Sequence, residues 1–534
     1  MKEIINFIVL SCHVFALDVK SGGRLSGAQE AMDVKHYLID IRVDPYKETI
    51  GGEVVIKFEL LRRTDFIEID LLDKYTVSST KIDGTSLAFT HEKNKLLIEN
   101  PGIVLFVDHE LLIRYGGKPP AAKNPPWSGG FTWSNDVEGR HWVGVSCQSN
   151  GAYVWYPCKE HPSDKPNGAE IIITTPKPLM AVSNGVLVSV ENTIDRWSRW
   201  HWKTEYPISA YNINFTIGNF ETIEKTGYVL DEPIDMVFYV LKEKMSGAVG
   251  LLEEAEEHLN FYARAFGQYP WKNEKFGLVH TPFSGMEHQT INAYGNNYEK
   301  TELGYDFILF HELGHEWWGN YLSVADWADF WIHEGVGTYA EAMYIEERFG
   351  LEKARAFIDD RFKKNITNSA PVVPQRNSTT KQKSGNDVYY KAAHFLHILR
   401  YLVGRDILWK TLNEFLYMPK ELPMNQTSTD EFLSLINENT KKDLRWVFDQ
   451  YLFSKDLPIL HMREKEKGNK RFIDLWWKNN GFKMPIEIEY DSFDGKRKKE
   501  LKLTNKPMRI VVPLKSKLII DPDRWLLYEL MVIR

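Results

Sequence analysis

The spacing of the apolar residues changes twice along this 534-residue chain, which limits how the chain can fold. From about Asp33 to Phe220, runs such as "HYLIDIRVD" and "EVVIKFELL" alternate or cluster β-branched residues and predict strands. From about Gly227 the spacing becomes helical, and "GLLEEAEEHLNFYARAFG" predicts an amphipathic helix that ends at Gly267. After "SKDLPIL", runs such as "MPIEIEYD" and "MRIVVPL" predict strands again. A chain of this length and pattern divides into several domains.

These segments predict a multidomain α+β protein. We expect an N-terminal antiparallel β domain over residues 30–225, a mainly α domain over 226–456 and a small C-terminal β-sandwich over 457–534. The stretch "GGKPPAAKNPPWSGGFTW" is rich in Pro, Gly and Trp and predicts a long surface loop within the first domain. A net charge of −7 without a long basic run argues against nucleic acid as a partner.

The first residues predict export. Residues 1–16, "MKEIINFIVLSCHVFA", have a weakly charged start and a short apolar run, as in a signal peptide cleaved after Ala16. The run is too short to cross a bilayer, and no other segment is apolar enough, so no transmembrane segment is expected. The expected location is therefore periplasmic or extracellular. A lipid anchor at Cys12 and a buried N-terminal strand are the alternatives.

Two cysteines, Cys147 and Cys158, remain if the signal peptide is removed. They either pair in an oxidising compartment or stay as ordinary free thiols. In both cases cysteine cannot supply the ligands of a metal site.

The stretch "HELGHEWWGN" predicts a metal site. His311 and His315 are four residues apart, so both imidazoles lie on one helical face and can bind one ion. A catalytic zinc takes three protein ligands and a water. A second, antiparallel helix, "DFWIHEGVGTYAEAMYIEERFG", would bring Glu334 back to the ion as the third ligand. This set is typical of thermolysin-like hydrolytic sites and predicts one Zn²⁺ per chain.

The motif also arises by chance, and a lone histidine in an apolar helix is more often a core residue. The acid on the following helix favours the metal over this alternative. Two neighbours are not expected to bind the ion. Glu341 is expected to hydrogen-bond to a metal ligand and not to the ion itself, and His333 is expected to point away from the site.

Glu312 lies about 100° around the helix from His311, so it is expected to reach the water held by the ion and not the ion itself. Zinc lowers the pKa of such a water to about 7, and a carboxylate base completes the deprotonation. The same group can then protonate a leaving amine. This combination predicts metal-assisted hydrolysis, with an amide as the natural target.

Together with these residues, several further stretches resemble one known family. "HELGHEWWGN", "ADFWIHEGVGTY" and "TPFSGMEHQT" are similar to the zinc aminopeptidases typified by aminopeptidase N, a family that also contains leukotriene-epoxide hydrolase. "DVKHYLIDIRVDP", "YPCKEHPSDKP" and "YNINFTIGNF" extend the resemblance over most of the chain.

The resemblance implies a site for the free α-amino group of a peptide. Glu287 in "GMEH" aligns with the family's amine-binding glutamate, and Gln148 in "SCQSNG" with the polar residue that assists it. A carboxylate opposite an ammonium group forms a charge-assisted hydrogen bond, whereas a blocked amine would leave it unpaired. Gly285 and Met286 would line the edge along which the peptide backbone lies.

The resemblance also implies a tyrosine that stabilises the oxyanion. The family pattern of Tyr-x-Lys at a helix start selects Tyr389 in "GNDVYYKAAHFLHIL", with Lys391 completing the match. Tyr390, as a packing residue, is the alternative.

The chain departs from the family pattern in three respects. His288 stands where asparagine is usual, and Ser284 where glycine is usual, which affects the shape of the amine pocket. Long members carry a helical domain after the β-sandwich, and this chain ends at Arg534. The alignment therefore predicts a more open cleft, or an oligomer in which a partner closes it.

The sequence thus predicts an exported zinc aminopeptidase that acts on peptides or oligopeptides with a free N-terminus. A zinc endopeptidase and a non-catalytic scaffold with a structural metal are the alternatives. Epoxide hydrolysis on the same site is not favoured, because nothing in the sequence indicates a lipid tunnel.

Overall fold

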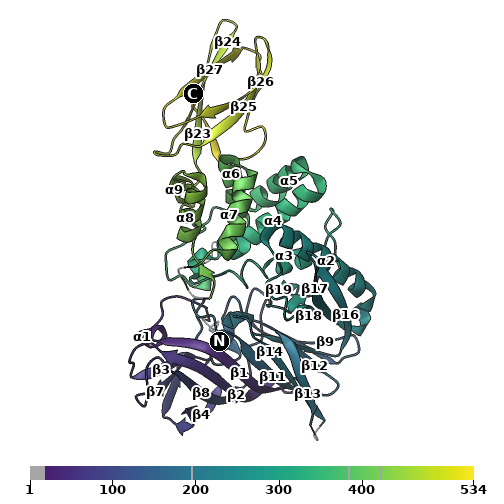
Figure 1. Ribbon diagram of the computed structural model, residues 1–534. Coiled ribbons are helices and arrows are strands. Elements are labelled where there is room, and N and C mark those ends of the chain that lie inside the picture. Colours follow the sequence, from purple (N-terminus) through teal and green to yellow (C-terminus); the bar gives the residue numbers. More distant parts are fainter. Residues whose placement is uncertain (1–18, 194–195, 383–384, 421, 423, 534) are drawn as a thin grey trace, which may run out of the picture.

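The computed structural model describes residues 19–193, 196–382, 385–420, 422 and 424–533. The predicted signal peptide and Cys12 lie outside these residues. Sheets of the N-terminal part, a central part with most of the helices, and the C-terminal sheets follow one another along the molecule (Figure 1).

The N-terminal part is made of three sheets. The largest is eight-stranded, in the order β13-β14-β11-β1-β2-β8-β4-β5. Its strands are β1 (Met32–Asp44), β2 (Thr49–Leu60), β4 (Thr76–Ile82), β5 (Thr85–Ser86), β8 (Asp108–Gly117), β11 (Ala169–Pro176), β13 (Val186–Asn192) and β14 (Trp197–Thr204). Buried and partly exposed residues alternate along most of β1, as expected for a strand with one face on the core. The prediction of an antiparallel domain needs one correction, because β1 pairs in parallel with β11.

Two smaller sheets complete this part. One has the order β12-β15-β10-β9 and the other β3-β7-β6. Their strands are β3 (Phe66–Asp70), β6 (Phe89–Glu92), β7 (Lys95–Glu99), β9 (Gly130–Asn135), β10 (His141–Ser146), β12 (Met180–Ser183) and β15 (Phe215–Gly218). The predicted surface loop is irregular only between β8 and β9, since its last residues, from Gly130 on, form β9.

A five-stranded sheet in the order β16-β17-β18-β20-β19 leads into the helical part. Its strands are β16 (Phe220–Val229), β17 (Glu232–Leu241), β18 (Phe276–His280), β19 (Gly285–Met286) and β20 (Asn292–Tyr294). The expected change to helix at Gly227 is therefore wrong, and the boundary expected between residues 225 and 226 falls inside β16. The missed signal is the alternation in β17, where Ile234, Met236, Phe238 and Val240 are buried.

The predicted amphipathic helix is α2 (Met245–Phe266), and it ends at Gly267 as expected. Gly267 has a φ of 93°, and a Cβ there would lie 2.6 Å from the Tyr417 hydroxyl, so glycine is required on both counts. The other longer helices are α3 (Phe307–Gly314), α4 (Trp331–Phe349), α5 (Leu351–Phe357), α6 (Tyr390–Val403), α7 (Arg405–Tyr417), α8 (Thr429–Thr440) and α9 (Arg445–Tyr451). None of the helices in the described ranges is both long and apolar enough to cross a bilayer.

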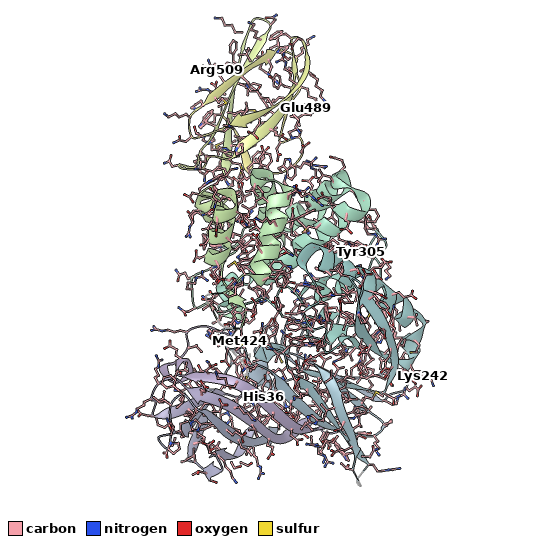
Figure 2. The ribbon with its side chains drawn as sticks, viewed as in Figure 1. His36, Lys242, Tyr305, Met424, Glu489 and Arg509 are labelled. Atoms are coloured by element: carbon pink, nitrogen blue, oxygen red, sulfur yellow. The ribbon has the colours of Figure 1, made fainter. Side chains whose placement is uncertain are left out.

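The C-terminal part contains two sheets, in the orders β27-β24-β23-β29 and β26-β25-β28. Their strands are β23 (Ile459–Lys467), β24 (Lys470–Trp477), β25 (Pro485–Ser492), β26 (Gly495–Lys502), β27 (Met508–Pro513), β28 (Leu518–Ile520) and β29 (Glu529–Ile533). Glu489 and Arg509 mark this end of the molecule in Figure 2. Cys147 and Cys158, in the N-terminal part, are buried free thiols, so the alternative of a disulfide is not observed.

Candidate metal centre and its cleft

The "HELGH" motif occupies the end of a short helix, α3. Asp306 caps its start, where the carboxylate accepts a hydrogen bond of 3.1 Å from the Leu309 N–H. The helix ends at Gly314, and His315 follows as the C-cap with a helical backbone. His311 and His315 therefore keep the one-turn spacing. Glu334 lies in the first turn of α4, the second helix predicted from the sequence.

Three side chains converge on one point. The Nε2 atoms of His311 and His315 are 3.3 Å apart. Glu334 Oε2 lies 3.5 Å from His311 Nε2 and 3.4 Å from His315 Nε2. Donor atoms held about 2.0–2.1 Å from one tetrahedral ion lie about 3.4 Å from each other, so these spacings fit zinc.

The donor chemistry fits as well. His315 Nδ1 is 2.9 Å from the Trp318 carbonyl oxygen. We assign the proton to Nδ1, which leaves a lone pair on Nε2 directed at the common point. Glu334 Oε2 is buried and has no hydrogen-bond partner among the described residues. A buried carboxylate oxygen without a hydrogen-bond partner, facing two imidazole nitrogens that face each other, is costly unless a cation joins the three groups.

Electrostatics favour positive charge at the same point. Burial alone would lower the pKa of His315, but the carboxylates of Glu334, Glu287 and Glu312 outweigh it and raise this pKa to about 10. Burial alone would raise the pKa of Glu334, yet the two histidines hold it below its ordinary value. The site is therefore built to stabilise a cation.

Glu312 projects into the cleft beside strand β19. Burial, followed by the charge of Glu287, raises its pKa well above the ordinary value for a glutamate. A Cβ built on Gly285 would lie 2.7 Å from Glu312 Oε1 and 2.6 Å from Ile308 Cγ2. Glycine at residue 285 thus gives Glu312 the space for its side chain.

Glu287 and Gln148 meet although they lie 139 residues apart. The Gln148 amide donates a hydrogen bond to Glu287 Oε1, and the Tyr211 hydroxyl donates another to the same oxygen at 3.3 Å. Glu287 is buried, whereas Gln148 is partly exposed in the turn that follows β10. This cluster lies at the boundary between the N-terminal β part and the helical part.

Glu316 and Asn320, two residues of the "HELGHEWWGN" stretch for which no role was predicted, join the end of α3 to the segment that carries Glu287. Glu316 is buried and accepts hydrogen bonds from Trp271 Nε1 at 2.7 Å, the Thr290 N–H at 3.0 Å and Asn292 Nδ2 at 3.0 Å. Asn320 Nδ2 donates to Glu316 Oε2 at 3.1 Å and to the Glu287 carbonyl oxygen at 2.9 Å. The end of α3 and the segment carrying Glu287 are therefore fixed relative to each other.

The two candidate tyrosines both line the cleft. The ring of Tyr389 lies 6.2 Å from that of His311, and after burial the charges of Glu334, Glu287 and Glu312 contribute most to its raised pKa. Tyr390 packs against Phe362, with ring centroids 6.2 Å apart. Tyr389 is thus the tyrosine that faces the charged groups.

The neighbours that were not expected to bind the ion lie outside the ligand triad. His333 Nε2 accepts a hydrogen bond of 3.1 Å from the Val324 N–H. Glu341 lines the cleft and accepts a hydrogen bond from Tyr305, which lies among the central helices (Figure 2). Ser284 lines the cleft too, whereas His288 is buried, and burial lowers its pKa to about 3.

All the predicted site residues line one cleft of about 490 Å³. They are Gln148, Gly285, Met286, Glu287, His311, Glu312, His315, Glu334 and Tyr389. The exposed side chain of Trp127, from the irregular segment between β8 and β9, forms part of the rim. The cleft thus brings together a candidate metal triad, the carboxylates of Glu287 and Glu312, and the phenol of Tyr389.

Comparison with known proteins gives a consistent result. The peptidase family M1 domain matches residues 251–451, and the peptidase M1 N-terminal domain matches residues 33–212. Endoplasmic reticulum aminopeptidase 1 of Mus musculus is 25% identical over 389 residues, covering 62% of this chain and 41% of its own length. Aminopeptidase M1 of Arabidopsis thaliana is 21% identical over 474 residues, covering 81% of this chain and 51% of its own length. The chain therefore spans about half or less of these relatives.

The fold agrees with this assignment. The crystal structure of an M1 zinc metallopeptidase from Deinococcus radiodurans superimposes with a TM-score of 0.67 at 20% identity, covering 80% of this chain and 95% of that one. Family matches to both the N-terminal and the catalytic regions, and a shared fold across them, lead to one conclusion: the chain belongs to the peptidase M1 family.

Proposed function

We propose that the protein is a zinc-dependent aminopeptidase that removes N-terminal residues from peptides. The observation that carries the proposal is the convergence, in one cleft, of the His311–His315–Glu334 triad with the Glu287–Gln148 pair. A metal alone fits many hydrolases, whereas an acidic cluster beside it selects a substrate with a positive charge near the scissile bond.

In this proposal His311, His315 and Glu334 hold one Zn²⁺. The ion, when bound, polarises the scissile carbonyl and lowers the pKa of a water to about 7. Glu312 takes a proton from the attacking water and returns it to the leaving amine. Its raised pKa supports this role, because such a carboxylate holds a proton more readily near neutral pH.

Glu287 and Gln148 bind the free α-amino group, and Gly285 and Met286 line the edge beside the peptide backbone. The hydrogen bond from Gln148 orients the carboxylate of Glu287, the group whose negative charge would attract an ammonium group. Tyr211, which the sequence did not reveal, assists in orienting the same carboxylate.

A paired assay tests amine recognition. We expect cleavage of peptides with a free N-terminus and, for the same peptides N-acetylated, a loss of about 10²-fold or more, because blocking leaves a buried carboxylate unpaired. Glu287→Gln should reduce the preference for the free amine. Equal cleavage of both peptides would instead identify an endopeptidase, and no cleavage of either would favour a scaffold with a structural metal.

Tyr389 donates its phenolic hydrogen to the developing oxyanion in this mechanism. We expect Tyr389→Phe to lower kcat by about 10²–10³-fold with little change in KM, as for the loss of one oxyanion donor. Tyr390→Phe is the matched control, because Tyr390 also lines the cleft but packs against Phe362. A larger loss in the Tyr390 variant would reverse the assignment.

The finer predictions on architecture and location belong to the same proposal. We propose a catalytic domain that begins near β16 and a C-terminal unit, from residue 457, whose two sheets form a small β-sandwich; Trp477, Ile486 and Leu501 are buried there.

Export is proposed from the signal pattern, and the N-terminal sequence of secreted material should begin at Leu17. Light scattering after size-exclusion chromatography measures the oligomeric state.

A further inference from the structure

Residues 19–23, "VKSGG", here called the strap, contact both the N-terminal part, at Tyr153 and Asn150, and the chain that precedes α6, at Ser378 and Thr379. Ser21 is completely buried. The Gly23 N–H donates to the Ser378 carbonyl oxygen at 3.1 Å, and Gly22 forms a β-bridge with Thr379. The strap is therefore paired with the loop 376–380 that precedes the Tyr389 helix.

One hydroxyl joins the strap to the turn that carries Gln148. Thr380 Oγ1 accepts a hydrogen bond from the Ser21 N–H at 3.1 Å and donates one to the Ser149 carbonyl oxygen at 2.6 Å. The Thr380 N–H donates in turn to the Ser21 carbonyl oxygen at 3.0 Å. Three segments that are distant in sequence meet at this side chain, directly beside Gln148.

The strap also holds the far side of the same turn. Ser21 Oγ donates to Glu160 Oε1 at 2.6 Å, and Glu160 Oε2 accepts from the Ala152 N–H. Asn150 Nδ2 donates to the Val19 carbonyl oxygen at 3.2 Å. The turn around Gln148 is thus fixed at Ser149, Asn150 and Ala152.

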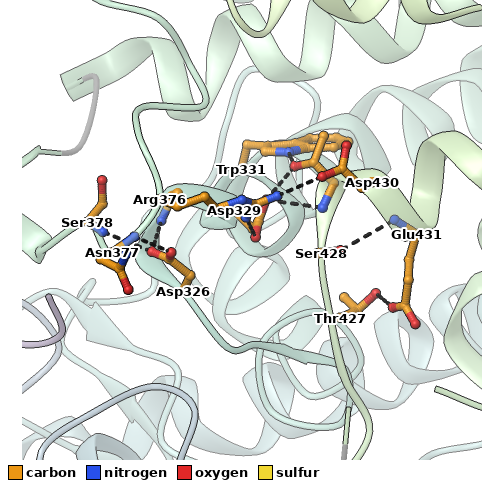
Figure 3. A network of polar contacts seen from close by, with 12 residues as sticks. Asp326, Asp329, Trp331, Arg376, Asn377, Ser378, Thr427, Ser428, Asp430 and Glu431 are labelled. Atoms are coloured by element: carbon orange, nitrogen blue, oxygen red, sulfur yellow. Dashed lines mark hydrogen bonds and ion pairs between the residues drawn. The ribbon is translucent and has the colours of Figure 1, made fainter. Parts of the chain in front are cut away.

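On its other side, the loop 376–380 is fixed to the base of α4. Asp326 accepts hydrogen bonds from the Asn377 N–H at 2.6 Å and the Ser378 N–H at 3.0 Å (Figure 3). Arg376 pairs with Asp329 and, at 3.2 Å, with Asp430. Asp329 lies just before α4, the helix of Glu334. Polar contacts therefore join the start of α4 to the loop 376–380, and Thr380 joins that loop to the Gln148 turn.

We propose that Thr380 and Ser21 are positioning residues for amine recognition, and that the strap holds Gln148 where it can meet both Glu287 and the substrate ammonium. The inference rests on the proposed aminopeptidase function. Gln148 lies on a turn and not on a regular element, so its position depends on these contacts. Loss of the Thr380 hydroxyl breaks two hydrogen bonds at once. The Ser149 carbonyl oxygen loses its donor, and the Ser21 N–H loses its acceptor.

The test measures recognition of the α-amino group separately from binding to the metal. Inhibition is measured with an amino acid hydroxamate and with its analogue lacking only the α-amino group, since both bind the metal and differ only in the amine. We expect Thr380→Val to reduce the preference for the amino compound by about tenfold and to raise KM, with kcat within about twofold. Thr380→Ser should restore the preference.

Thr379→Val is the matched control, because the Thr379 hydroxyl contacts Gln382, three residues further along the chain, at 3.3 Å and forms no hydrogen bond with the described residues of the strap or the Gln148 turn. A preference unchanged in Thr380→Val, or lost equally in Thr379→Val, would overturn the inference. If Thr380→Val does not fold, Ser21→Ala is tested in its place. The same loss of preference for the amino hydroxamate over its amine-free analogue is expected, and an unchanged preference would overturn the inference. A wild-type protein that cleaves no free-amine peptide would contradict the proposed function itself, and is detected before any variant is compared.

Discussion

Replacing Glu312 by glutamine is expected to lower kcat by about 10²–10⁴-fold, the contribution of a positioned general base. Glutamine keeps the shape of the side chain but cannot accept the proton of the attacking water. The metal content should stay at one Zn²⁺ per chain, because Glu312 is not part of the ligand triad. Atomic absorption of the variant, beside its kinetics, checks both expectations.

The same substitution should not destabilise the fold. Glu312 and Glu287 are close enough for each charge to disfavour the other, and burial already raises the pKa of Glu312. Glutamine is uncharged and carries no such penalty in the buried cleft, so the thermal midpoint should stay unchanged or rise. Glu341→Gln is the control, because Glu341 is a second carboxylate on the cleft wall and hydrogen-bonds to Tyr305. Equal losses in both variants would contradict the role of Glu312 as the base.

Removal of the metal is expected to abolish peptide cleavage, with a loss of about 10³-fold or more, since the ion contributes several kcal/mol to the stability of the transition state. One equivalent of Zn²⁺ should restore activity. Binding should also raise the thermal midpoint, because a ligand that binds only the folded protein stabilises it.

His315→Ala tests whether activity depends on metal binding by the triad. This variant removes one of the three ligands, and its cleavage should not recover at Zn²⁺ concentrations that restore the wild type. The control is His333→Ala, a histidine one residue before Glu334 that contacts Val324 and lies outside the triad. Full activity in a metal-free sample, verified by elemental analysis, would refute the hydrolytic mechanism.

The metal triad was accessible from the sequence because it depends on local periodicity. The spacing of His311 and His315 is fixed by one helical turn, and Glu334 needs only a turn and a second helix. The contacts of Glu316 with Trp271, of Asn320 with the Glu287 carbonyl oxygen and of Tyr211 with the Glu287 carboxylate were missed, because each joins segments far apart in the chain, for which no spacing rule exists. Gln148 and Glu287 were paired only through the family resemblance.

The same limit explains the errors in the fold. The parallel pairing of β1 with β11 joins residues more than 120 positions apart, and nothing in either strand's own pattern specifies a parallel neighbour. The β16–β17 hairpin was missed for another reason. Its alternation was present in the sequence, but the strong helical signal of α2 directly after it dominated the interpretation.

Cys147 immediately precedes Gln148, is completely buried, and has a pKa that burial raises well above that of an ordinary thiol. A thiol-specific reagent can therefore react with it only when the polypeptide around the turn opens transiently. The rate of that labelling, followed at Cys147 separately from the buried thiol of Cys158, would report how often the turn around Gln148 opens, and a bound inhibitor should slow it.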